Sequence, residues 1–223
     1  MRTLGWVLVR CGLLALVLLI VACGSSTAAD STSSTTGSTP TSVSSLACGP
    51  SAAKTLASST AARVYESGGS IYGCARGGSR RYKLGNATTC IRSERAGPIA
   101  LAGAIVAYGL EACGIDTGTS EVVVQRLSDG RKLRTLAATT GRLGPESYQV
   151  VGSVVVRRDA AVAWIAQARS IPRHSGDVEV HRADRRGRAK LDSGTSIEAG
   201  SLRLHGSTLS WRHGAASRSA TLL

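Results

Sequence analysis

The sequence predicts an all-β fold built from short antiparallel strands. From Cys48 to Leu223, Val-rich runs of strand length alternate with glycine-containing turns. Long stretches of helical periodicity are missing, and only residues 51–62 have a weakly helix-like composition. Short apolar runs bounded by turn residues are typical of sheet proteins. A third observation, an internal repeat, divides these strands into units.

The repeat becomes visible when the chain is aligned with itself. An offset of 56 residues places Tyr108 on Trp164, an offset of 103 places it on Trp211, and a looser offset of 34 places Cys74 on Tyr108. Each of the four copies predicts a strand, a glycine turn, a second strand ending in the marker residue, a loop and a third strand. We expect the aromatic markers to pack between neighbouring sheets.

Two of the copies also predict a fourth strand. Tight turns at 128–130 and 184–187 suit hairpins that lead into strands over 132–137 and 188–191. Each complete unit is therefore expected to be an antiparallel sheet of four strands. The last copy is expected to lack its outer strands.

Three phrases of the repeat carry a resemblance to known proteins: Ile71-Tyr-Gly-Cys74-Ala-Arg, Leu191-Asp-Ser-Gly194 and Leu209-Ser-Trp211. They resemble the blades of TolB-like and WD-repeat-like β-propellers, above all those of uncharacterised exported bacterial lipoproteins. The resemblance covers about residues 60–223 and implies a small or incomplete propeller-like array, because the chain has room for about four units. Its motifs are structural and imply no catalytic residue. A β-sandwich is the alternative architecture.

The N-terminal residues predict an export signal and a lipid anchor. Two basic residues, Arg2 and Arg10, precede an apolar run over residues 13–22. This run has the length of a signal-peptide core. The run ends in Ile20-Val-Ala-Cys23, which resembles the lipobox of bacterial lipoproteins. That resemblance implies removal of residues 1–22 and attachment of lipid to the Cys23 thiol.

Residues 23–47 predict a spacer between this anchor and the folded part. The segment after Cys23 consists mostly of Ser and Thr, with Asp30 as its only charge. Such a composition buries too little apolar surface to offset the entropy of ordering, so we expect a disordered tether. Two or more acyl chains on Cys23 would hold the chain stably at a bilayer. The β-repeat domain then spans residues 48–223, on the extracytoplasmic face of the cell membrane.

Four cysteines remain in that domain: Cys48, Cys74, Cys90 and Cys113. None forms a CxxC pair, and an even number in an oxidising compartment favours disulfides over a zinc site. If residues 102–104 form a hairpin turn, positions summing to about 206 lie opposite each other, and Cys113 falls near Cys90. This register favours Cys90–Cys113 and leaves Cys48–Cys74, while the other pairings and free thiols stay open.

The charge of the chain is strongly basic. The formal net charge is +13, and +11 once Arg2 and Arg10 are removed. The arginine excess is explained either by compositional bias of the genome or by attraction to an anionic membrane or envelope polymer. One basic cluster motivates the second interpretation: Arg182, Arg185, Arg186, Arg188 and Lys190. Nucleic acid is not an expected partner, since no nucleic-acid motif is present.

The sequence offers little sign of catalysis. The four histidines lack metal-ligand spacing, and no GxSxG motif occurs, so we predict no metal, no cofactor and no catalytic residue. A solvent-exposed position is expected for histidines such as His181. The predicted function is a membrane-anchored binding or scaffold module whose partner, an anionic envelope polymer or an envelope protein, contacts loops 111–120 and 170–176. The alternative is a cell-envelope hydrolase with its site on the same loops.

Overall fold

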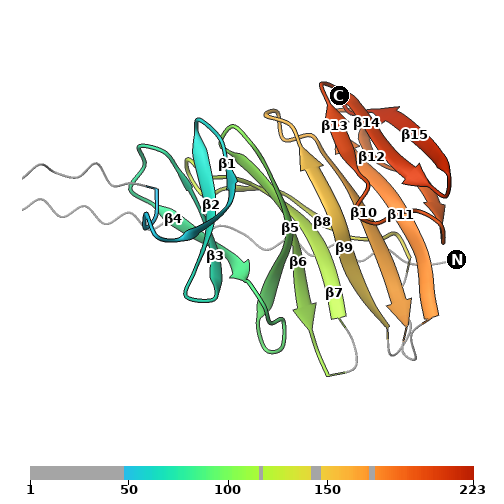
Figure 1. Ribbon diagram of the computed structural model, residues 1–223, viewed down its shortest axis with the longest axis horizontal. Coiled ribbons are helices and arrows are strands. Elements are labelled where there is room, and N and C mark those ends of the chain that lie inside the picture. The colour runs from blue at the N-terminus through green and yellow to red at the C-terminus, as the bar shows by residue number, and fades with distance from the viewer. Residues whose placement is uncertain (1–47, 116–117, 142–146, 171–173) are drawn as a thin grey trace, which may run out of the picture. The chain divides into compact units, whose positions relative to one another are not determined.

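The computed structural model describes residues 48–115, 118–141, 147–170 and 174–223 (Figure 1). The predicted signal peptide, Cys23 and the tether lie outside these residues. The prediction of an all-β fold is confirmed, because the described residues form fifteen strands and no helix. The helix-like composition of residues 51–62 is misleading. This segment contains strand β1 (Lys54–Ser58), since antiparallel pairing with β2 outweighs its weak local preference.

The strands fall into four consecutive antiparallel groups, called units 1 to 4. Unit 1 contains β1, β2 (Ala62–Ser67), β3 (Ser70–Ala75) and β4 (Arg81–Asn86). Unit 2 contains β5 (Glu94–Ala102), β6 (Ile105–Cys113), β7 (Gly118–Arg126) and β8 (Lys132–Ala137). Unit 3 contains β9 (Ser147–Val156), β10 (Val162–Ser170), β11 (His174–Asp184) and β12 (Gly187–Gly194). Unit 4 contains β13 (Arg203–His205), β14 (Thr208–His213) and β15 (Ala216–Thr221).

The connections between units are sparse in backbone hydrogen bonds. Units 1 and 2 share one parallel residue pair, Asn86 with Arg95, and units 2 and 3 share one, Gly118 with Tyr148. These pairs join units 1 to 3 into a single mixed sheet, and unit 4 forms a separate small sheet. The strand order does not return from β12 to β1, so the described sheet is open.

Side-chain packing, rather than backbone pairing, holds neighbouring units together. On β7, Val123 belongs to the apolar cluster shared with unit 1, whereas Val122 and Val124 belong to the cluster shared with unit 3. On β10, Trp164 faces unit 2 and Ile165 faces unit 4. Successive strand residues point to opposite faces, so such uninterrupted apolar runs identify strands that are buried on both sides. The units are therefore stacked face to face.

The four predicted markers, Cys74, Tyr108, Trp164 and Trp211, lie on β3, β6, β10 and β14 and are all buried. Three of them lie on the second strand of their unit, whereas Cys74 lies on the third strand of unit 1. The prediction that the second strand ends at the marker is wrong for β6 and β10, because these strands continue to Cys113 and Ser170. Strand β8 has the predicted bounds, while β12 extends three residues beyond the prediction. The expectation that unit 4 lacks its outer strands is wrong in part, because β15 supplies a third strand there.

The favoured disulfide pairing is also confirmed. Cys90 is bonded to Cys113 and Cys48 to Cys74, with Cα–Cα distances of 5.1 and 5.6 Å. A register shift between Ala96 and Ile99 brings the ends of the β5–β6 hairpin into the predicted register. The described residues contain both disulfides and four apolar clusters, which together form a core.

Candidate functional site

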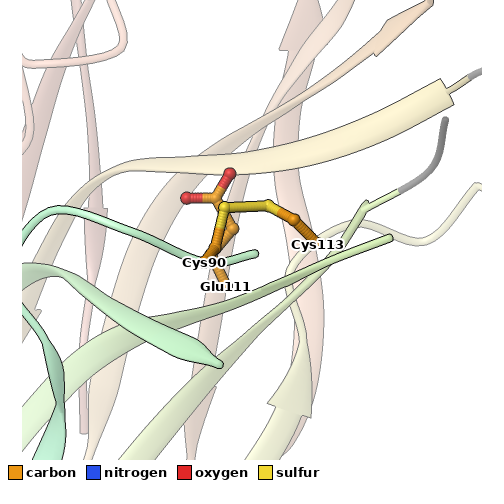
Figure 2. Close-up of side chains that lie close together, drawn as sticks. All are labelled: Cys90, Glu111 and Cys113. Atoms are coloured by element: carbon orange, nitrogen blue, oxygen red, sulfur yellow. A yellow bond between two sulfur atoms is a disulfide. The ribbon is translucent and has the colours of Figure 1, made fainter. Parts of the chain in front are cut away.

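One group of three potential metal ligands occurs among the described residues: Cys90, Glu111 and Cys113. Figure 2 shows the Glu111 carboxylate beside the disulfide that joins the two cysteines. A metal would need thiolates, and both sulfur atoms are used in this bond. The carboxylate is moreover held by the Arg95 guanidinium, whose Nε lies 2.8 Å from Glu111 Oε2. With the disulfide formed, these residues do not fit a metal ion. They form a cross-linked strand end beside an ion pair.

A cavity of about 220 Å³ lies next to this ion pair, where β5, β6, β7 and β9 meet. Its lining residues are Arg95, Gly97, Pro98, Gly109, Leu110, Glu111, Ser120, Val150 and Val151. A side chain at Gly109 would not fit, since its Cβ would lie 2.9 Å from Val151 Cβ. A Cβ at Gly97 has room, because its nearest neighbour, the Gly109 carbonyl oxygen, would be 3.7 Å away. The cavity is therefore lined by one positively charged side chain, one negatively charged side chain and several apolar residues.

The structure places only part of the predicted binding loops at this cavity. Glu111 and Ser120, the two ends of the predicted loop 111–120, both line it. Most of that stretch is strand, because β6 continues to Cys113 and β7 begins at Gly118. Residues 171–173 of the second predicted loop, 170–176, lie outside the described residues, and its remaining residues belong to β10 and β11. Strands β6 and β10, which lead into the two loops, run in the same direction in Figure 1.

Glu179 is the centre of a buried polar group between units 2 and 3. Its carboxylate accepts hydrogen bonds from the Thr140 backbone N–H at 2.8 Å and from the Thr140 hydroxyl at 2.9 Å. His181 Nε2 lies 2.8 Å away and Lys190 Nζ lies 3.3 Å away. The His181 ring is fully buried and stacks on Trp164, with 5.0 Å between ring centroids. The expected solvent exposure of His181 is therefore wrong, because both faces of β11 are covered by neighbouring units.

Burial and hydrogen bonding set the charges of this pair. Burial alone raises the pKa of Glu179, but the bonds from Thr140 and His181 outweigh it and lower the pKa from 4.5 to about 2. Burial lowers the pKa of His181 below its ordinary value of 6.5, and the contact with Glu179 opposes this only in part. At neutral pH the pair is therefore a carboxylate beside a neutral imidazole, and Nε2–H donates to Glu179.

A second buried carboxylate, Asp192, closes the contact between units 3 and 4. It accepts hydrogen bonds from the Trp211 indole N–H at 2.8 Å and from Arg218 at 2.6 Å, and His213 Nδ1 lies 3.0 Å away. Burial raises the pKa of Asp192, yet these contacts lower it overall. Sequence reasoning missed both carboxylates, since neither belongs to a recognisable catalytic or metal-binding motif.

The basic cluster that suggested an anionic partner is engaged within the domain: Arg182, Arg185, Arg186, Arg188 and Lys190. Arg182 and Arg186 pair with the buried Asp184. Arg188 donates to the Ala137 carbonyl oxygen at 2.8 Å and lies over the Trp164 ring. Lys190 pairs with Glu179. Four of the five cations thus neutralise buried acids or join units, which leaves little of this cluster for an external anion.

Comparisons with protein-family models, with curated proteins and with solved structures found no match to this chain. Within the part of the chain that the structure describes, no helix has the length and hydropathy needed to span a membrane.

The Glu179–His181 pair predicts how stability depends on pH. The folded-state pKa of each residue is below its ordinary value, so each contributes stability that is lost as the pH falls: His181 from about 6.5 downwards and Glu179 from about 4.5 towards 2. Substituting Glu179→Gln should lower the free energy of unfolding at pH 7 by about 3 kcal/mol, because Lys190 and Thr140 lose an anionic partner. It should also flatten the dependence below pH 4.5. Urea unfolding across this pH range measures both effects.

The matched control is Asp177→Asn, which removes one exposed acid from the same strand. This variant should keep the stability and pH dependence of the parent protein. Equal losses in the two variants would contradict a structural role for the Glu179 carboxylate.

Proposed function

We propose that the protein is a membrane-anchored, extracytoplasmic binding or scaffold module built as a small, open, propeller-like array of stacked units. Four consecutive antiparallel units, three of which have a buried aromatic marker on the second strand, support the propeller-like interpretation. Two disulfides suit an oxidising compartment. The lipobox-like sequence at Cys23 supports the anchor.

The cavity beside Arg95 and Glu111 is the observation that carries the binding role. At about 220 Å³ it is smaller than the pockets that hold whole drug-sized ligands, and it suits one inserted side chain of a partner. Its ion pair offers a hydrogen-bonding donor and acceptor at the rim, while Leu110 and Val151 supply apolar walls. Because the lining residues belong to β-strands, the shape of the cavity is already formed before the partner binds.

The described acids argue for scaffold rather than hydrolase. Glu179 and Asp192 are ionised and hydrogen-bonded by neighbouring units, so they lack the proton that a general acid needs. Glu111, the acid at the cavity, is paired with Arg95. Glu179 and Asp192 join neighbouring units through their hydrogen bonds.

Filling the cavity tests the binding role. A tagged full-length protein is cross-linked in its native cells, and the captured partners are compared with those of Gly97→Leu, in which a side chain occupies the cavity. We expect a defined set of partners to be lost with Gly97→Leu but kept with Gly200→Leu, whose added side chain meets open space. Capture of the same set by all three proteins would contradict the proposal.

The anchor is tested separately by metabolic labelling with an alkyne fatty acid. The parent chain should take up label and remain with the membrane fraction, whereas Cys23→Ala should do neither, since the thiol is the predicted site of attachment. Label on the Cys23→Ala chain, or a parent chain found entirely in the medium, would show that the anchor is wrongly assigned.

A further inference from the structure

Positive charge is concentrated at the N-terminal end of the β-domain. Residues 48–93, which contain unit 1, include seven Lys and Arg residues and one acid, Glu66. Residues 94–223 include eighteen basic and twelve acidic residues over nearly three times the length. Unit 1 is therefore far more one-sided in charge than the rest of the domain.

Some of these cations have structural partners within unit 1. Arg63 donates to the carbonyl oxygens of Pro50 and Ala53, and Arg76 donates to that of Ser59. Lys54 pairs with Glu66. In a second set of three neighbouring cations, the side chains form no hydrogen bond or ion pair with any described residue: Arg80, Arg81 and Lys83. This set is available to an external anion.

The strand register places two of these cations on the outer face of unit 1, away from unit 2. Arg81 lies opposite Cys74, and Lys83 lies opposite Tyr72. Tyr72 packs with Tyr65 and Cys74, in a cluster separate from the one shared with unit 2. The Arg81 guanidinium lies 5.2 Å from the centre of the Tyr72 ring. The outer face therefore combines cations with tyrosine rings, a mixture suited to a surface that is apolar on one side and wet on the other.

A cavity of about 330 Å³ opens beside these residues. Its lining residues are Cys48, Gly49, Pro50, Tyr65, Cys74, Gly78, Ser79, Arg80 and Arg81. Two guanidinium groups and the Ser79 hydroxyl are hydrogen-bond donors, and no acid is among the lining residues. The buried Tyr65 hydroxyl in its wall has no hydrogen-bond partner among the described residues. This donor set matches the oxygens of a phosphate group.

We infer that this cavity and the adjoining face bind the phosphate groups of anionic phospholipids. The inference rests on the proposed membrane anchor. The chain enters the described part at Cys48, and the Cys48–Cys74 disulfide fixes that entry point on the outer face of unit 1. The end of the predicted tether is thus beside the cations. A basic surface next to a lipid-bearing residue supplies a second attachment to the same membrane and orients the domain on it.

Vesicle co-sedimentation of the chain from Gly24 to Leu223 tests this without the lipid. This chain should bind vesicles of phosphatidylglycerol mixed with phosphatidylcholine, and binding should weaken as NaCl is added. Replacing Arg80 and Arg81 by Gln should lower the partition coefficient about 25-fold, since each cation near an anionic surface contributes roughly a fivefold preference. Replacing Arg131 and Lys132 by Gln removes the same charge from exposed positions in unit 2 and should have little effect.

Three results would overturn the inference. The first is binding to pure phosphatidylcholine vesicles that is as strong as binding to the anionic vesicles. The second is an equal loss of vesicle binding in the Arg80/Arg81 and Arg131/Lys132 double variants. The third is binding to a soluble phosphate polymer without binding to the anionic vesicles. Because the tested chain lacks Cys23, these outcomes are independent of whether that residue is lipidated and of whether the Arg95–Glu111 cavity binds a partner.

Discussion

Burial of both faces of the central strands is the constraint on which this structure depends. Units 2 and 3 each have a neighbour on either side, so β7 and β10 place alternate residues into two different apolar clusters. Backbone pairing between units is limited to single residue pairs, and side chains must therefore supply the cohesion. Each polar group caught between units must also find a partner there, because an unpaired buried donor or acceptor is costly. Glu179 and Asp192 meet that requirement by accepting several hydrogen bonds each.

The two end faces of the stack do not share this constraint, and their composition differs accordingly. Unit 4 ends in a polar face of Ser210, Arg212, Ser217 and Ser219, as expected for a terminal repeat that meets water. Unit 1 ends instead in tyrosines, arginines and a disulfide. An arrangement in which unit 1 faces an anionic bilayer accounts for this difference, and it leaves the cavity between units 2 and 3 accessible to a partner. The proposed scaffold role thus assigns a separate surface to attachment and to recognition.

Local and periodic features of this fold could be predicted from sequence. The bounds of β8 follow from the tight turn at 128–130, and the Cys90–Cys113 pairing follows from counting outward from one hairpin. Features that depend on distant contacts were missed. The expected exposure of His181 rests on its lack of metal-ligand spacing, which carries no information about packing, whereas a strand covered on both sides buries Glu179 and His181 as well as Val180. At the candidate site, the predicted loop contains Glu111 and Ser120, and the hairpin register that predicts Cys90–Cys113 also pairs Arg95 with Glu111. Val151 could not be predicted, because it comes from β9, which only the stacking of units 2 and 3 brings to this site.

The stacking itself is tested most directly by the indole N–H groups. In the chain from Gly24 onwards only Trp164 and Trp211 remain, so their two resonances are resolved without ambiguity. The Trp164 indole donates across to the Ala138 carbonyl oxygen at 2.7 Å, and the Trp211 indole donates to Asp192 at 2.8 Å, so each crosses a contact between units. Hydrogen exchange of ¹⁵N-labelled protein in D₂O should show both indole groups strongly protected, with lifetimes close to those of the slowest backbone amides. Exchange of either indole within the dead time, while the strands remain protected, would contradict face-to-face stacking of the units.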